Sequence, residues 1–187
     1  MKRIAVFCGA SSGVNETYVQ AAREVGRKVA ERNLMLVYGG GHTGLMGVLA
    51  DAALAAGGEV VGVIPQSLVD REIAHSGLSR LEIVSDMLTR KARMAALADA
   101  FVALPGGYGT LDELFEMLTW TQIGVQAKPC GVLNVDGYYD ALLAWTAHAV
   151  HEGLIREGHK KLLIAETEIG ELLDELASWT FQEIPLR

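Results

Sequence analysis

Three glycine-rich segments carry the first chemistry that this sequence suggests. They are Cys8–Asn15 (CGASSGVN), Gly39–Gly47 (GGGHTGLMG) and Pro105–Glu113 (PGGYGTLDE), and each follows a short apolar run. Glycine lets the backbone approach a ligand closely, and free N–H groups at the start of a helix attract anions. One such loop is more simply a tight strand-to-helix turn, but three that converge favour a phosphate site. The candidate phosphate contacts are Ser12, Gly40, Gly41, Thr43 and Gly44.

Two familiar nucleotide motifs do not fit these loops. Gly39, Gly41 and Gly44 satisfy G-x-G-x-x-G, but the next apolar run ends at Pro65–Gln66, where a dinucleotide site needs an acidic residue for the ribose. Leu45 stands where a P-loop requires lysine. We therefore disfavour both an NAD-linked oxidoreductase and a P-loop kinase or NTPase.

A charged residue falls on the apolar face of a predicted helix. The segment Ser85–Ala100 reads as a helix whose cap is one of its first two residues. Arg90 lies three residues after Met87 and four before Met94, so helical spacing turns its guanidinium inward with that stripe. A charge there needs an anionic partner, which is either a ligand or a structural carboxylate, unless the side chain reaches out from the edge.

The neighbouring charges have simpler interpretations. Lys91 and Arg93 are expected on the solvated face of the same helix. Thr110 and Glu113 fit a capping box, in which the glutamate reaches back to the N–H of the capping threonine. Glu113 would nevertheless lie one turn inside a helix whose N-terminal loop holds a phosphate, and from there it could act on the attached sugar.

Cysteine and histidine usage predicts neither disulfide nor metal. Cys8 and Cys130 each lie at the edge of an apolar run and are expected to be buried free thiols, which fits a reducing cytoplasm. His42 lies in the second glycine-rich segment, and the other histidines lack cysteine or carboxylate partners at metal-ligand spacing. We expect no metal and no cofactor.

The elements that position these residues recur with a regular rhythm. Helix-length segments separate most of the short aliphatic runs, which indicates an α/β fold with a doubly wound, Rossmann-like parallel sheet and helices on both faces. Ligands then bind beyond the carboxyl ends of the strands, where the glycine loops lie. The expected strands are Arg3–Cys8, Leu34–Tyr38, Val60–Ile64, Leu81–Val84, Phe101–Leu104, Pro129–Asn134 and Leu162–Ile164.

Size and charge exclude other classes of protein. The 187 residues suit one domain, which we expect to span 1–187. A formal net charge of −7 would repel a nucleic acid backbone. No stretch approaches the roughly 20 apolar residues of a membrane span, and the start of the chain reads as a strand and turn rather than a signal sequence.

Taken together, GGGHTGLMG, MLTRK (Met87–Lys91) and PGGYGTLDE resemble the LOG family, the cytokinin riboside 5′-monophosphate phosphoribohydrolases. The resemblance implies a homodimeric hydrolase that splits an adenine-type nucleoside 5′-monophosphate into free base and ribose 5-phosphate. Many relatives carry the label lysine decarboxylase. A pyridoxal-phosphate enzyme would normally need a larger fold and a Schiff-base lysine, and nothing around Lys91 or Lys128 suggests one.

The resemblance also implies roles for particular residues. Arg90 and Glu113 match the catalytic pair of the family. The substrate contacts match Glu72, Lys91, Gly106, Gly107, Tyr108, Gly109, Thr110, Leu111, Asp112 and Thr119. Many plant relatives have two glutamates after the GTL of the third loop, whereas this chain has Asp112–Glu113.

Two questions stay open at this point. The same scaffold could bind a nucleotide or cofactor without cleaving it, as a non-catalytic carrier. The motifs also do not say whether the base is adenine or an N6-prenylated adenine, and so whether the role is nucleotide salvage or cytokinin activation.

In the catalytic interpretation, positive charge builds on the ribose as the C1′–N9 bond breaks, and a carboxylate below C1′ stabilises that charge.

Overall fold

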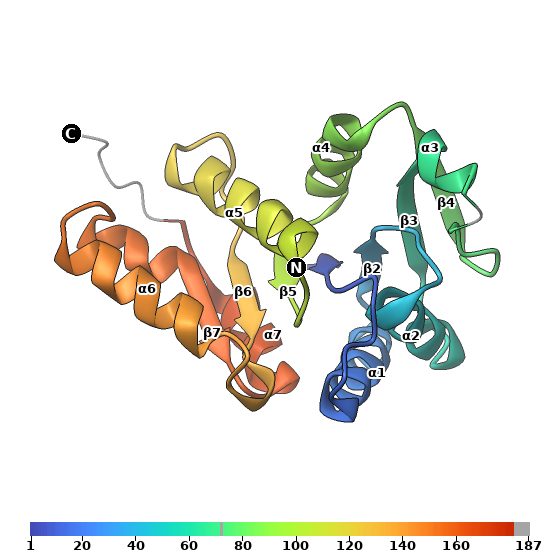
Figure 1. Cartoon of the computed structure of the whole chain (residues 1–187), viewed down its shortest axis with the longest axis horizontal. Coiled ribbons are helices and arrows are strands. Elements are labelled where there is room, and N and C mark those ends of the chain that lie inside the picture. Colours follow the sequence, from blue (N-terminus) through green and yellow to red (C-terminus); the bar gives the residue numbers. More distant parts are fainter. Residues whose placement is uncertain (72, 182–187) are drawn as a thin grey trace.

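A computed structural model describes residues 1–71 and 73–181 and contains a seven-stranded parallel sheet (Figure 1). The strand order is β4-β3-β2-β1-β5-β6-β7. The predicted doubly wound α/β architecture is confirmed, and each strand lies within two residues of its predicted bounds. The strands are β1 (Arg3–Phe7), β2 (Met35–Tyr38), β3 (Val60–Pro65), β4 (Arg80–Val84), β5 (Ala100–Ala103), β6 (Cys130–Leu133) and β7 (Leu163–Glu166).

Helices cover both faces of this sheet (Figure 1). One layer is formed by α1, α2 and α7, and the other by α4, α5 and α6, while the short α3 follows β3. Two short 3-10 turns, Val135–Gly137 and Glu157–Leu162, complete the described elements. The helices are α1 (Glu16–Glu31), α2 (Gly44–Ala55), α3 (Gln66–Val69), α4 (Met87–Leu97), α5 (Tyr108–Gln122), α6 (Asp140–His151) and α7 (Ile169–Ser178).

The central strand β1 shows why its sequence is apolar throughout. Ile4 and Val6 pack into the core beneath α1, α2 and α7, whereas Ala5 and Phe7 pack into the core beneath α4, α5 and α6. Successive side chains of a strand point to opposite faces, so a strand between two helical layers needs apolar residues at every position. Both cysteines are buried and free, as expected.

The direction of winding reverses between β1 and β5, which are adjacent in the sheet. The connections on either side of this switch leave in opposite directions, which opens a crevice at the carboxyl ends of the strands. The loops after β1, β2 and β5 are the three glycine-rich segments. Within residues 1–71 and 73–181, no helix is long and apolar enough to cross a membrane.

The helix predicted over Ser85–Ala100 is shorter in the structure. It runs as α4 from Met87 to Leu97, because Asp86 caps its start and β5 already begins at Ala100. The Asp86 carboxylate accepts a hydrogen bond of 2.8 Å from the Thr89 N–H. A strand that follows within three residues leaves no room for a longer helix.

Candidate active site

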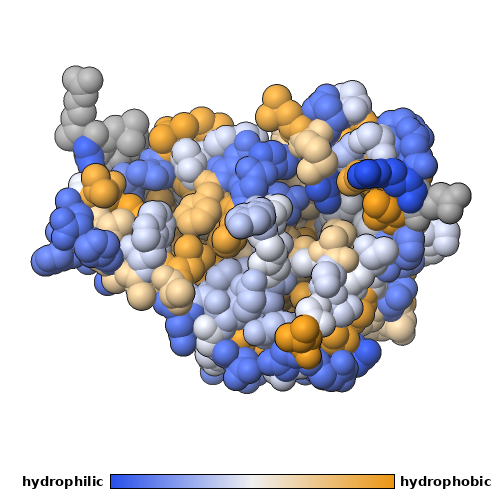
Figure 2. All heavy atoms as spheres, in the orientation of Figure 1, coloured by the Kyte–Doolittle hydropathy of each residue, from blue (hydrophilic) through white to orange (hydrophobic). Residues whose placement is uncertain are grey.

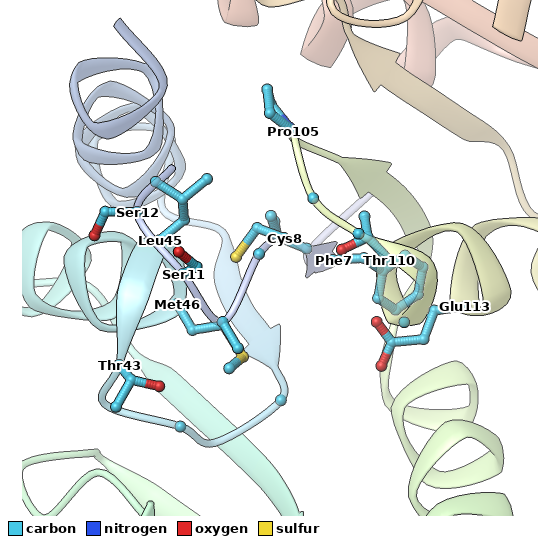
Figure 3. Close-up of a pocket in the computed structure, with 18 of the residues that line it drawn as sticks. Phe7, Cys8, Ser11, Ser12, Thr43, Leu45, Met46, Pro105, Thr110 and Glu113 are labelled. Atoms are coloured by element: carbon cyan, nitrogen blue, oxygen red, sulfur yellow. The ribbon is translucent and has the colours of Figure 1, made fainter. Parts of the chain in front are cut away.

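A cavity of about 610 Å³ lies where β1, β2 and β5 end. Its lining combines the three glycine-rich loops with the first turns of α4 and α5. Thr110 and Glu113 lie on one side, and Ser11, Ser12 and Thr43 lie across from them (Figure 3). The glycine loops therefore do converge, as the sequence predicts.

The loops interlock through glycines that have no room for a side chain. Gly44 has a φ of +59°, and a Cβ there would lie 2.3 Å from the Ala10 carbonyl carbon in the loop after β1. A Cβ on Gly106 would lie 2.1 Å from Thr110 Oγ1 and 2.9 Å from the Gly9 nitrogen. Glycine at these positions allows three backbones to meet at one point, which is the close approach that the sequence suggests.

Two helices enter the cavity without a side-chain cap. By contrast, the Asn15 side chain accepts from the Thr17 N–H at 3.0 Å and so caps α1. The helices α2 and α5 begin after Thr43 and Gly107, and among the described residues no side chain accepts from their first N–H groups. Free donors and the positive end of a helix dipole together make an anion site.

Arg90 and Glu113 form a buried ion pair beside these loops. Arg90 Nη1 lies 3.3 Å from Glu113 Oε1, and the side chains are only 9% and 11% exposed. The rest of the guanidinium is held by backbone, because Nε donates to the Val63 carbonyl at 3.0 Å and Nη2 donates to the Gly39 carbonyl at 3.1 Å. A Cβ on Gly39 would lie 1.9 Å from Nη2, so glycine is required here for the arginine to fit.

Burial raises the pKa of the Glu113 carboxyl above its ordinary value of 4.5, and the positive charge of Arg90 opposes that rise. A carboxylate with a raised pKa is a stronger base than an exposed one, and a fixed partner holds it in one orientation. The Glu113 carboxyl group faces the cavity (Figure 3). The arrangement therefore suits general-base or charge-stabilising chemistry.

Cys8 also faces this cavity but is poorly suited to act as a nucleophile. Burial first, and the nearby Glu113 second, raise the pKa of its thiol far above the ordinary value. The thiolate is the reactive form of cysteine, so this thiol stays protonated and unreactive.

Lys91 is not on a solvated face, and that expectation is wrong. Its side chain is only 13% exposed, and its Nζ lies 3.0 Å from Asp112 Oδ2 and 3.1 Å from Glu116 Oε2. Burial disfavours the charged amine, but these two carboxylates outweigh it and raise the pKa of Lys91. Arg93 does lie on the solvated face, where it pairs with Glu82.

The capping box predicted for Thr110 and Glu113 is also wrong. The helix begins at Tyr108 with Gly107 as its cap, so Glu113 lies a full turn and a half inside α5. Its carboxylate pairs with Arg90 instead of reaching back to the cap. The two glycines before Tyr108 allow the chain to enter the helix earlier than the threonine-glutamate spacing suggests.

Most of the other predicted contact residues border the cavity. The lining includes Ser12, Gly41, Thr43, Arg90, Gly106, Gly107, Gly109, Thr110, Asp112 and Glu113. Gly40 and Gly44 adopt positive φ angles and shape the loop after β2.

The remaining predicted residues are placed elsewhere or are not described. The Tyr108 side chain is 95% exposed, and Leu111 packs beside the core under α4, α5 and α6. Thr119 donates to the Phe115 carbonyl at 2.7 Å, further along α5. Glu72 lies outside the described residues.

The structure adds lining residues that sequence reasoning missed. Tyr18 of α1 and Tyr138 after β6 line the cavity, as do apolar side chains that include Met46 and Ile73. The one feature of the sequence at Tyr138 is the segment Asp136-Gly-Tyr-Tyr139, whose composition is typical of a turn. The positions of Tyr18 and Met46 in their helices give no signal at all.

Comparison with known proteins finds a matching family model and solved structures that share the fold. A protein-family model described as a possible lysine decarboxylase matches residues 46–176. Two solved structures share the fold over 95% of this chain. The first is the molybdenum cofactor binding protein from Rippkaea orientalis, with a TM-score of 0.73, 20% sequence identity and 97% of that chain covered. The second is the Moco carrier protein from Chlamydomonas reinhardtii, with a TM-score of 0.71, 19% sequence identity and 98% of that chain covered. At these identities the likeness concerns the fold alone.

Curated sequences give a closer relationship. The chain is 48% identical over 185 residues to the cytokinin riboside 5′-monophosphate phosphoribohydrolase LOG7 of Arabidopsis thaliana, covering 98% of this chain and 85% of that protein. It is 46% identical to the probable phosphoribohydrolase LOGL2 of Oryza sativa subsp. japonica, covering 97% and 74%. The chain therefore belongs to the LOG family, as its motifs predict.

Proposed function

We propose that this protein hydrolyses the N-glycosidic bond of an adenine-type nucleoside 5′-monophosphate and releases free base and ribose 5-phosphate. One observation carries the proposal: a buried carboxylate, held by an arginine, shares a cavity with the uncapped starts of two helices. The carboxylate supplies the chemistry at the sugar, and the helix starts supply a phosphate site one sugar away. The names of the family relatives support the same reaction.

Glu113 carries the chemical step in this proposal. As the C1′–N9 bond lengthens, its electron pair moves to the base and positive charge develops on the ribose ring. The Glu113 carboxylate stabilises that charge and takes a proton from the attacking water, whose oxygen bonds to C1′. The base leaves with a proton from solvent. This mechanism requires no metal and no organic cofactor.

Arg90 keeps the carboxylate ready for that step. Two of its nitrogens are held by the Val63 and Gly39 carbonyls, which leaves Nη1 directed at Glu113. Burial raises the pKa of the Glu113 carboxyl, and the fixed positive charge of Arg90 opposes that rise by favouring the ionised form. The same charge complements the phosphate or the departing base when substrate fills the cavity.

Amino-acid decarboxylation, which the description of the family model names, finds little support in the side chains. A Schiff-base lysine must lose its proton to attack a carbonyl carbon. Lys91, which lies next to Arg90 in the sequence, is instead held as an ammonium by Asp112 and Glu116. Lysine chemistry at this position would require both ion pairs to break.

The test is to incubate the protein with AMP and with N6-isopentenyl-AMP and to follow base and ribose 5-phosphate by chromatography. Glu113→Gln keeps the shape of the side chain, and we expect it to lower base release by about a thousandfold while the protein stays folded. The ratio of the two wild-type rates distinguishes nucleotide salvage from cytokinin activation. AMP binding without base release would overturn the proposal in favour of a carrier.

The assembly and location belong to the same proposal. We propose one domain, a homodimer and a cytoplasmic location, with no nucleic acid partner. Hydrophobic residues are exposed along the upper edge of the molecule in Figure 2. Leu88 in the first turn of α4 and Ile123 at the end of α5 are 68% and 48% exposed. Such surface suits a subunit contact. Light scattering should give twice the chain mass, and Leu88→Lys should lower it. Two free buried thiols support the reducing location.

A further inference from the structure

The turn after β6 contains two consecutive tyrosines whose hydroxyl groups both reach the loop after β5. Asp136 and Gly137 have φ angles of +52° and +71°, so the chain reverses sharply just before them. Tyr138 Oη donates to the Gly106 carbonyl at 2.6 Å, and Tyr139 Oη donates to the Leu104 carbonyl at 2.6 Å. A non-glycine residue in the left-handed region costs about 1 kcal/mol, so this turn is held by its surroundings.

Three consecutive carbonyl groups of that loop, those of Leu104, Pro105 and Gly106, each accept a hydrogen bond. Between the two tyrosine bonds, the Pro105 carbonyl accepts from the Gly9 N–H at 3.1 Å. The peptide group is planar and trans, so where the next residue has an N–H, that N–H points opposite to the fixed carbonyl. Fixing the Gly106 carbonyl therefore fixes the direction of the Gly107 N–H. Gly107 is the cap residue of α5 and lines the cavity.

The ring of Tyr138 is itself held in place. It packs edge-on against Tyr18 of α1 with ring centroids 5.4 Å apart, and against Tyr139 with centroids 5.1 Å apart. The Asp136 carboxylate accepts from the Asn15 side chain at 3.1 Å, and Asn15 also caps α1. The turn is thus tied to the loop after β1 as well as to the loop after β5.

We propose that Tyr138 is a positioning residue for the 5′-phosphate: its hydroxyl orients the peptide group between Gly106 and Gly107 so that the Gly107 N–H faces the phosphate. The inference rests on the proposed function, because it assumes that the phosphate binds at the start of α5. Tyr138 does not act on the bond that breaks. Its contribution is to hold one donor of the phosphate site in the orientation that binding needs.

The neighbouring tyrosine offers a matched control. Tyr139→Phe also removes one hydroxyl that bonds to a carbonyl of the same loop. It frees the peptide group between Leu104 and Pro105, which has no N–H because the second residue is proline. Tyr139 is only 2% exposed, so its loss should lower the thermal midpoint more than the loss of the Tyr138 hydroxyl. A purely structural role would make the two variants behave alike toward phosphate ligands.

The experiment measures binding of ribose 5-phosphate and of adenosine by calorimetry to the wild-type protein and both variants. We expect Tyr138→Phe to weaken ribose 5-phosphate about fivefold, as the loss of one hydrogen bond predicts, and to leave adenosine unchanged. Tyr139→Phe should leave both ligands within about twofold of the wild type. With AMP as substrate, KM of Tyr138→Phe should rise about fivefold while kcat changes little.

Three results would overturn the inference, and the third is distinguishable from the first two. If wild-type protein binds ribose 5-phosphate and Tyr138→Phe binds it equally well, or if both variants weaken it alike, Tyr138 has no special role toward the phosphate. If wild-type protein binds neither ribose 5-phosphate nor AMP, the proposed function itself fails and takes this inference with it.

Discussion

The cavity has two walls of different construction. The backbone wall consists of the loops Gly9–Gly13, Gly39–Thr43 and Pro105–Gly107, and the charged wall consists of the side chains that α4 and α5 bring together. The backbone wall presents peptide dipoles that do not titrate and that most side-chain substitutions leave in place, so added atoms that push the loops apart are the most direct way to break it. The charged wall depends on pairing, so it fails when one partner is lost.

The largest effect should come from breaking the buried pair in the charged wall. Arg90→Ala leaves Glu113 buried without its counter-charge, which should lower the free energy of unfolding by about 3 kcal/mol and kcat/KM by about a hundredfold or more. Urea unfolding and steady-state kinetics measure the two losses.

A double variant checks that the loss comes from the unpaired charge. Arg90→Ala with Glu113→Gln should recover part of the stability but none of the activity. If the stability losses of the two single variants simply add, the residues are not coupled and the description of the charged wall is wrong.

Adding a methyl group to Gly106 should lower the stability of the protein, whereas adding one to Gly109, three residues further on, should change it little. Gly106→Ala should lower stability by about 2 kcal/mol, because its Cβ would overlap Thr110 Oγ1 and the Gly9 nitrogen. Gly109→Ala meets no described atom within 4 Å and lies in the first turn of α5, so it should change stability by less than about 1 kcal/mol. Thermal unfolding compares them, and equal losses would refute the interlocked loops.

The smallest effect concerns pH and belongs to the charged wall alone. Glu113 must be ionised to act as a base, and burial raises its pKa, so kcat/KM should fall on the acid side through a value above 4.5. After Arg90, the charges that act on Glu113 are Asp112, which raises its pKa, Lys91, which lowers it, and Glu116, which raises it.

Two opposite substitutions test that assignment. Lys91→Met should move the acid limb to higher pH, and Asp112→Asn should move it to lower pH. A pH profile of kcat/KM for each variant measures the shift. Movement in the same direction for both would show that another group sets the limb.

Local periodicity in the sequence was enough to predict the sheet and the inward position of Arg90. The strands are apolar runs of ordinary length, and Arg90 follows the spacing of Met87 and Met94 along one helix. Of these three side chains, Met94 and Arg90 are buried, whereas Met87, which lines the cavity, is 46% exposed. Helical spacing gives the face of a residue but not how far the neighbouring element extends over it.

The partners of the charged residues could not be predicted in the same way. Arg90 and Glu113 lie on different helices, and no local spacing tells which carboxylate a buried guanidinium will meet. The position of Lys91 along α4 predicts a solvent-exposed side chain, but the side chain packs against α5 and pairs with carboxylates there. The bond from Tyr138 to Gly106 joins residues 32 apart in the chain through a turn, so only the packed fold brings them together.

The uncapped starts of α2 and α5 link ligand binding to the stability of these two helix ends. Side chains complete the first turns of α1 and α4, whereas water must complete those of α2 and α5 until a ligand arrives. A bound phosphate would then accept hydrogen bonds from these N–H groups, as a capping side chain does at the start of α1. Occupancy of the site and the stability of these two helix ends are then linked, so the starts of α2 and α5 should be more mobile in the free protein and more rigid when it holds its product.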